Sequence, residues 1–88
     1  MIRRRLLIRG RVQGVFFRDT LRRLAERHRV AGWARNTSEG TVEAVLEGDE
    51  PGVEAVVDFA REGPEGASVS SVDVEDEVPQ GLHGFEIR

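Results

Sequence analysis

The 88-residue chain contains no cysteine and no lysine, so that its thirteen basic residues are all arginine. Without cysteine there is no disulfide framework and no thiolate to act as nucleophile or metal ligand, which fits the reducing cytosol. Long apolar runs are missing too: the N-terminal arginines are followed only by Leu6, Leu7 and Ile8, whereas a signal peptide needs roughly 7–15 apolar residues. We therefore expect a cytoplasmic protein without a membrane-spanning segment.

The sequence also lacks linkers, internal repeats and low-complexity tracts. A chain of this size buries roughly 60% of the surface that its unfolded form exposes, which is enough for a small core without disulfides. We therefore expect residues 1–88 to form a single domain.

Charges of both signs are present, but they are distributed unevenly along the chain. Eleven of the thirteen arginines precede residue 36, whereas acidic residues gather in the second half, as in DVEDE at residues 73–77. The arginine-rich half could attract an anionic ligand, or it could be a solvated face that binds nothing. The acidic segment resembles a cation site only in its charge, because strand-like alternation would divide its side chains between two faces. A solvated edge strand is the simpler interpretation.

Apolar periodicity predicts a strand and then a helix in the first third of the chain. Over residues 5–12, apolar and arginine side chains alternate, which is typical of a strand with one buried face. Over residues 17–30, the apolar spacing becomes helical. The side chains that share the inner helical face are Phe17, Leu21, Leu24, Ala25 and His28. Gly32 follows, so the helix is expected to end near Val30.

The rest of the chain repeats these strand and helix patterns. Runs at residues 32–36 and 41–48 are joined by a short glycine-containing loop, which favours a β-hairpin. Pro51 suits the first turn of a second helix, and strand patterns follow at residues 68–78 and 84–88. The order predicts an α+β, ferredoxin-like βαββαβ sandwich, with two helices on one face of an antiparallel or mixed sheet of four to five strands.

This topology brings two distant residues to one edge of the sheet. In a right-handed crossover the first two strands are parallel, so their carboxyl ends share an edge. One hairpin strand lies between them, which separates them by about 10 Å, or two strand spacings. Arg18 follows the first strand and Asn36 ends the second. We therefore expect these two residues to approach one another.

The segment GRVQGVFFR at residues 10–18 connects the predicted first strand to the first helix. Such a turn leaves N–H groups unpaired at the positive end of the helix dipole, where an anion can bind. The residues of this candidate phosphate-binding loop are Gly14, Val15, Phe16, Phe17 and Arg18. Gly14 would let the amides point inward, the apolar triplet would anchor the loop in the core, and Arg18 would suit a phosphoryl group.

The loop by itself is a weak motif. Glycine-containing turns are common and most bind nothing, and the G-K-[ST] element of a nucleotide-binding Walker loop is absent. Asn36 could hold a water molecule near an anion, but asparagine is also an ordinary turn former. Trp33 suits the core better than a ligand site. His28 and His83 have no evident partners and suit the surface better than a catalytic or metal site.

Two segments together resemble the paired signatures of the acylphosphatase family: GRVQGVFFR at residues 10–18 and GWARNTSEGTVEAVLEG at residues 32–48. The resemblance extends over essentially the whole chain. Ala34 and Glu39 stand where the family often has valine and aspartate, beside the motif residues rather than among them. The resemblance implies a small ferredoxin-like enzyme that hydrolyses the carboxyl-phosphate bond of acyl phosphates without a metal or cofactor.

The resemblance also implies roles for individual residues. The loop from Gly14 to Arg18 would hold the phosphoryl group, with Arg18 as the phosphate-binding arginine, and Asn36 would orient the attacking water. An acyl phosphate has a good carboxylate leaving group, so positioning and charge stabilisation are the main demands. We accordingly expect a small-molecule acyl phosphate as substrate, inorganic phosphate as product inhibitor, no nucleic-acid or membrane partner, and a monomer.

Three other functions are compatible with the same fold. RNA-recognition domains share the topology, but they need exposed aromatic residues on the central strands, which residues 5–12 and 41–48 lack. A non-catalytic regulatory or anion-binding module would keep the fold without the chemistry. Acylphosphatase-like domains also occur within larger carbamoyl-transfer proteins, against which the length of the chain argues. Release of phosphate from acetyl or benzoyl phosphate without added metal would separate the enzyme from the binding modules.

Overall fold

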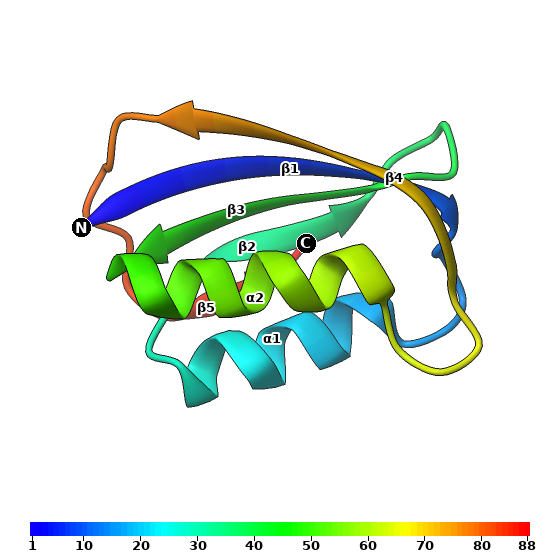
Figure 1. Ribbon diagram of the computed structural model, residues 1–88, viewed down its shortest axis with the longest axis horizontal. Helices are drawn as coiled ribbons and strands as arrows, with labels where there is room; N and C mark the ends of the chain where they lie inside the picture. Colours follow the sequence, from blue (N-terminus) through cyan, green and yellow to red (C-terminus); the bar gives the residue numbers. More distant parts are fainter.

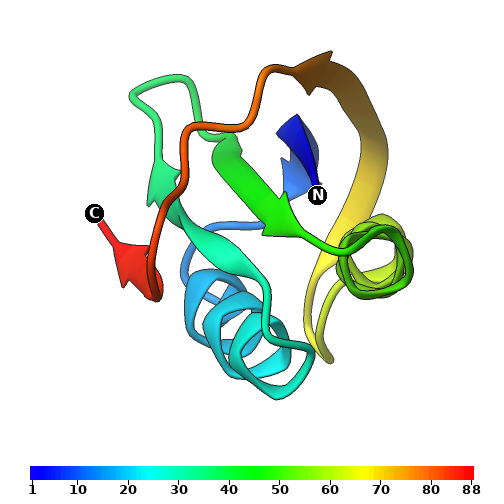
Figure 2. The same ribbon diagram turned by 90° about the vertical axis from the view of Figure 1, so that its left-hand side faces the viewer.

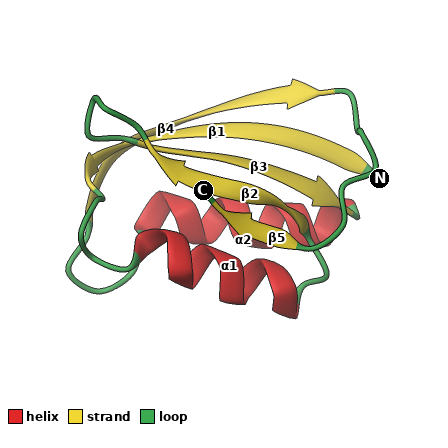
Figure 3. Cartoon of the chain, turned by 180° about the vertical axis from the view of Figure 1, so that it is seen from behind, coloured by secondary structure: helices red, strands yellow, loops and turns green.

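The computed structural model describes residues 1–88, and its five strands and two helices follow the predicted order (Figure 1). The elements are β1 (Ile2–Arg11), α1 (Phe17–Arg27), β2 (Ala31–Asn36), β3 (Val42–Gly48), α2 (Glu50–Glu62), β4 (Ser68–Glu77) and β5 (Phe85–Ile87). Both helices cover the same face of the sheet (Figures 2 and 3). Neither helix has the length and apolarity that crossing a membrane would require.

The strands form one mixed sheet in the order β4-β1-β3-β2-β5. β3 lies between β1 and β2 and is antiparallel to both, so β1 and β2 run in the same direction, as the crossover requires. β4 pairs antiparallel with β1, and the short β5 pairs parallel with β2. The predicted ferredoxin-like sandwich is confirmed, with β5 as a fifth strand at the edge.

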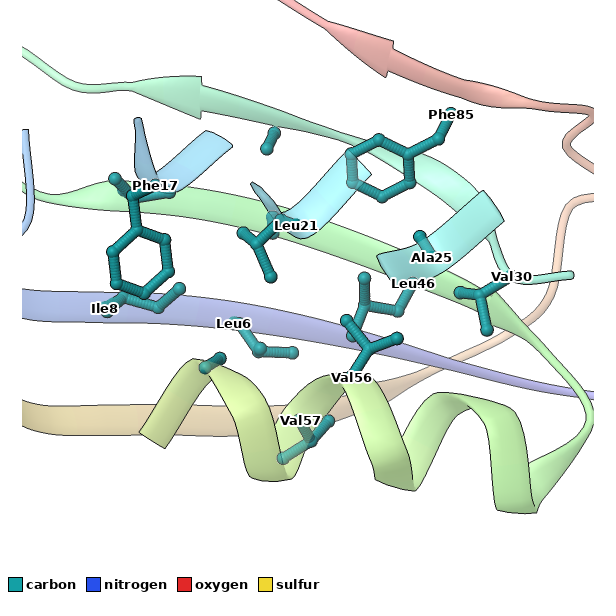
Figure 4. Packing of buried hydrophobic residues seen from close by; sticks show 14 of the residues in the cluster. Leu6, Ile8, Phe17, Leu21, Ala25, Val30, Leu46, Val56, Val57 and Phe85 are labelled. Carbon is teal, nitrogen blue, oxygen red and sulfur yellow. The ribbon is translucent and has the colours of Figure 1, made fainter. Parts of the chain in front are cut away.

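The core lies between the sheet and the helices (Figure 4). Leu6 and Ile8 of β1 are fully buried and stand opposite Ala44 and Val42 of β3. The buried residues of the two helices are Phe17, Leu21, Ala25, Val53, Val56, Val57 and Ala60. Burial of one large apolar side chain stabilises the fold by about 1.5–3 kcal/mol. Because Phe17 is the first residue of α1, its burial fixes the N-terminus of that helix beside the end of β1.

α1 ends about one turn before Val30, where the sequence pattern placed its end. The helix closes with a Schellman motif: the N–H of Arg29 donates to the carbonyl of Glu26 at 3.2 Å, and that of Val30 to the carbonyl of Ala25 at 2.8 Å. Arg29 adopts a left-handed φ of 57°, a conformation that glycine usually supplies at this position. Because the chain reverses here, His28 is exposed and does not lie on the inner face.

The sheet face without helices carries ion pairs rather than a free basic surface. β1 lies between the acidic β4 and β3, so its arginines meet carboxylates on both sides. The pairs on this face are Arg3–Glu47, Arg3–Glu77, Arg5–Glu43, Arg5–Glu77, Arg9–Asp73 and Arg35–Glu43. Most arginines of β1 are therefore paired with carboxylates, whereas Arg11 is exposed and forms no ion pair. The acidic β4 is a largely exposed edge strand, as expected, and several of its carboxylates also form ion pairs with β1.

Glu47 of β3 is the one buried carboxylate of this network, at 1% exposure. It accepts the N–H groups of Gln80, Gly81 and Leu82 at 2.9, 3.0 and 3.1 Å, and the Nη1 of Arg3 at 2.7 Å. Burial by itself would raise the pKa of Glu47, but these donors outweigh burial and hold the pKa below its ordinary value. Glu47 thereby fixes the connection that carries β5 to its place beside β2.

Candidate active site

A cavity of about 250 Å³ lies where the end of β1 meets the start of α1. Its lining residues are Val12, Gly14, Phe16, Phe17, Arg18, Asp19, Asn36 and Ile87. The cavity therefore brings together Arg18 and Asn36, which confirms the juxtaposition expected from the topology. Val12, Asp19 and Ile87 were not among the predicted site residues.

The β1–α1 loop, residues 12–16, has an unusual backbone beside this cavity. Gly14 and Phe16 adopt positive φ values of 76° and 58°, and such reversals turn successive N–H groups toward one concave side. Phe16 is the N-cap of α1 and provides no side-chain hydrogen bond to the helix. The first N–H groups of α1 and the positive end of its dipole are thus without a side-chain cap, which suits an anion.

The three apolar side chains of the loop segment have different environments. Phe17 is only 2% exposed and Val15 packs partly buried against the core, so these two anchor the segment. Phe16 is 79% exposed. The expectation that the whole triplet anchors the loop is therefore wrong for Phe16, because its left-handed backbone directs the ring away from the core. Val15, although it belongs to the predicted phosphate-binding loop, does not line the cavity.

Gln13 connects this loop to the hairpin that follows Asn36. Its Nε2 donates to the carbonyl oxygens of Thr37 and Thr41 at 2.9 and 3.0 Å. The two threonine hydroxyls also contact each other at 2.6 Å. Asn36 itself is the last residue of β2 and pairs with Val42 of β3. The loop and the end of β2 are therefore held as one unit.

β5 provides the third side of the site. Arg18 donates from Nη1 to the main-chain oxygen of Arg88 at 3.1 Å, and the N–H of Arg88 donates to the carbonyl of Ala34 in β2 at 2.9 Å. Ile87 lines the cavity because β5 runs parallel to β2 and ends beside it. Sequence patterns predicted a final strand but not its partner, so the contribution of Ile87 was missed.

Asp19, in the first turn of α1, is the only carboxylate among the lining residues. It is paired with Arg23 and Arg22, the latter through Nη2 at 2.8 Å. The hydrogen bond from Arg23, followed by the charges of both arginines, lowers the pKa of Asp19. Asp19 is therefore ionised at neutral pH, and the two arginines compensate its charge beside the cavity. The only sequence signal for Asp19 is its acidic type in the first helical turn, where an acid also favours the helix dipole without any ligand.

The remaining candidates lie outside the cavity. Trp33 is 8% exposed on the ion-paired face, with the guanidinium carbons of Arg5 and Arg88 at 5.7 and 4.6 Å from its ring. It is a packed residue, as expected. His28 and His83 are both exposed. No group of three histidine or acidic side chains comes together in a way that could hold a metal ion.

Comparison with known proteins identifies the family. The acylphosphatase family model matches residues 4–87. The acylphosphatases of Haloarcula marismortui and Thermococcus kodakarensis are each 50% identical over 86 residues, which covers 98% of this chain and 94% of each relative. That of Rubrobacter xylanophilus is 51% identical over 85 residues, covering 96% of this chain and 77% of the relative.

Solved structures agree with these sequence relationships. The acylphosphatase from Bacillus subtilis superposes with a TM-score of 0.96 at 32% identity, covering 100% of this chain and 99% of that one. Full-length HypF, in a phosphate- and nucleotide-bound form, matches 99% of this chain with a TM-score of 0.91 at 27% identity, but over only 12% of its own length. The fold thus also forms part of a much larger protein. By family model, sequence and structure alike, the chain belongs to the acylphosphatase family, the hydrolases of acyl phosphates.

Proposed function

We propose that the β1–α1 loop and Arg18 hold the phosphoryl group of an acyl phosphate while Asn36 orients the water that hydrolyses it. The observation that carries this proposal is that Gly14, Arg18 and Asn36, from three parts of the fold, line one cavity at the N-terminus of α1. Family membership supplies the reaction, and the positions of these residues support their roles.

The phosphoryl group would be bound mainly by the backbone. The uncapped N–H groups that begin α1 and the positive φ values of Gly14 and Phe16 favour an anion at this point. Arg18 adds a full positive charge and a planar set of donors that matches phosphoryl oxygens. Its hydrogen bond to the main chain of Arg88 restricts the guanidinium before substrate arrives, which lowers the entropy lost on binding.

The water would be positioned by Asn36. An asparagine amide can both donate to and accept from a water molecule, and a water held opposite the bridging oxygen is aligned for in-line attack. The water oxygen then forms a bond to phosphorus while the bond from phosphorus to the bridging oxygen breaks. The electron pair leaves with the carboxylate, and the proton of the water passes to a phosphoryl oxygen of the substrate.

This route assigns no proton transfer to Asp19. Because hydrogen bonds from Arg23 and the nearby arginine charges lower its pKa, Asp19 is a weak base at neutral pH. A carboxylate leaving group also needs little protonation, so charge stabilisation by the loop and Arg18 supplies most of the catalysis.

Steady-state kinetics with benzoyl phosphate and inhibition by inorganic phosphate, both without added metal, test these roles. Arg18→Ala should weaken phosphate inhibition by roughly 10- to 100-fold, since hydrogen bonds to charged groups contribute about 1.5–3 kcal/mol. Asn36→Ala should lower kcat by roughly 100-fold and leave phosphate inhibition nearly unchanged. Arg61→Ala, which removes an exposed arginine of α2, is the matched control.

Full turnover in Asn36→Ala would contradict the role in positioning water. A wild-type protein that binds phosphate in this cavity but releases none from benzoyl phosphate would be an anion-binding module instead. If phosphate at millimolar concentration does not compete with the substrate, the proposal of a phosphate site in this loop is wrong.

We further propose that residues 1–88 work as one cytoplasmic, monomeric domain, with no nucleic-acid or membrane partner and with inorganic phosphate as product inhibitor. The only large apolar side chains that are exposed are Met1, Phe16 and Val78, and the open sheet face carries paired charges. Trp33, the one aromatic residue on that face, is packed beneath two arginines and is not available to stack on bases. Sedimentation equilibrium tests the monomer: a concentration-dependent mass above 9.8 kDa would contradict it.

A further inference from the structure

Phe16 is an exposed aromatic residue at the edge of the proposed active site. Of the three exposed large apolar side chains, Met1, Phe16 and Val78, only Phe16 lines a cavity that contains Arg18 and Asn36. Scattered exposed apolar residues need no explanation. An exposed apolar residue beside converging polar groups does need an explanation, because small-molecule sites combine an apolar wall with a few polar groups that fix the orientation of the ligand.

The backbone holds Phe16 in this exposed position at a conformational cost. Its φ of 58° and ψ of 29° are left-handed, a region that only glycine occupies without steric penalty. The same residue fixes the start of α1, because its carbonyl accepts the N–H and the Oγ1 of Thr20 at 3.0 and 2.8 Å. A bulky side chain is therefore maintained where glycine or asparagine would be easier to accommodate, and such local strain often accompanies function.

The cavity offers more than a phosphoryl site. Val12 and Phe17 are nearly inaccessible, at 1% and 2% exposure, so the accessible apolar lining comes from Phe16 and the half-buried Ile87. The cavity has a volume of about 250 Å³. That exceeds the space of a phosphoryl group and leaves room for part of a second group beside the apolar side chains.

We infer that Phe16, together with Ile87, forms the contact surface for the acyl group, so that this chain favours acyl phosphates with an aromatic or bulky apolar acyl group over acetyl phosphate. This inference rests on the proposed function of the same cavity. An aromatic acyl group gains both apolar burial and ring contact against Phe16, whereas an acetyl group is too small to cover the ring.

The test compares kcat/KM for benzoyl phosphate and acetyl phosphate in matched variants. Phe16→Ala and Phe16→Asn should each lower the ratio of kcat/KM for benzoyl phosphate to kcat/KM for acetyl phosphate about tenfold. Asparagine tolerates the left-handed backbone, so equal effects in the two variants attribute the loss to the ring. The preference of Phe16→Leu for benzoyl phosphate should lie between that of these two variants and that of the wild type. Val78→Ala, at an equally exposed apolar residue outside the cavity, should leave kcat/KM unchanged for both substrates.

Equal losses for both substrates would overturn the inference, because Phe16 would then act through the shape of the loop. No loss for either substrate in Phe16→Ala or Phe16→Asn would overturn it as well. Arg18→Ala, measured in parallel, separates this failure from failure of the proposed site. If Arg18→Ala abolishes activity on both substrates while Phe16→Ala does not discriminate between them, the phosphoryl site stands and only the acyl contact is wrong.

Discussion

At the scale of single residues, two backbone torsions decide whether the β1–α1 loop can face an anion. Gly14 has a φ of 76°, and a Cβ built on it would meet no atom within 4 Å. The need for glycine at this position therefore comes from the torsion and not from crowding by the rest of the protein. Phe16 achieves the second reversal without glycine, and its ring is consequently exposed.

We predict that Gly14→Ala lowers both stability and phosphate affinity. A left-handed residue with a Cβ costs about 1–2 kcal/mol, and relaxation of the torsion would turn the loop amides away from the cavity. Urea unfolding and phosphate inhibition measure the two effects. Gly40→Ala is the control, because Gly40 has a φ of 85° and equally open surroundings but lies outside the site. It should lose similar stability and keep its phosphate affinity; if phosphate binding falls equally in both variants, the loop has no special role.

At the scale of elements, the three-residue β5 contributes more to the site than its length suggests. It adds Ile87 to the cavity wall, and the residue after it, Arg88, offers Arg18 a main-chain acceptor at 3.1 Å. The strand reaches this place because Glu47 fixes the preceding connection. The orientation of Arg18 is thus coupled to the buried carboxylate of β3 through β5.

Deleting Arg88 should therefore weaken phosphate binding about fivefold, because Arg18 loses one solvent-exposed hydrogen bond, which contributes about 1 kcal/mol. Arg88→Ala retains the main-chain oxygen and removes only the side chain that stacks on Trp33, so it should bind phosphate like the wild type. Phosphate inhibition constants of the two proteins provide the comparison. If Arg88→Ala is as impaired as the deletion, the side chain and not the main chain supports Arg18.

The existence and order of the elements could be predicted from sequence because period-two and helical spacing report directly on burial, as at Leu6, Ile8 and Leu21. The approach of Arg18 to Asn36 followed from the handedness of the crossover. The end of α1 could not be predicted, since Arg29 adopts a left-handed torsion that is not expected for an arginine. The partners of the β1 arginines could not be predicted either, because the pairing of strands that are distant in sequence decides which carboxylate lies opposite each arginine.

At the scale of the whole molecule, the uneven charge of the sequence becomes an ordered arrangement in the fold. The basic β1 lies between two acidic neighbouring strands, and its arginines lower the pKa of carboxylates on both sides. Burial opposes ionisation of Glu43, but hydrogen bonds from Arg35 and Arg5 outweigh it and lower its pKa. Hydrogen bonds from Arg5 and Arg3 lower the pKa of Glu77 directly. These carboxylates bind protons less readily in the folded chain than in the unfolded chain, so acid should favour unfolding.

Glu47 provides the sharpest test of this acid dependence. Its pKa is held below the ordinary value of 4.5 in the folded protein, so its contribution to the free energy of unfolding is complete above about pH 4.5 and is lost as the pH falls through the folded pKa. At pH 7, Glu47→Gln should reduce the free energy of unfolding by about 3 kcal/mol, because it leaves the buried Arg3 guanidinium without one of its two carboxylates.

Urea unfolding of Glu47→Gln and the wild type between pH 7 and pH 3 should therefore give curves that converge in acid, since protonation removes the same charge from the wild type. Glu75→Gln is the matched control: Glu75 is exposed on β4 and should have almost no effect at any pH. Parallel curves for the wild type and Glu47→Gln would mean that the carboxamide merely disturbs packing around residues 80–82. Convergence would instead locate part of the acid sensitivity of the fold in the carboxylate that holds β5 beside the proposed active site.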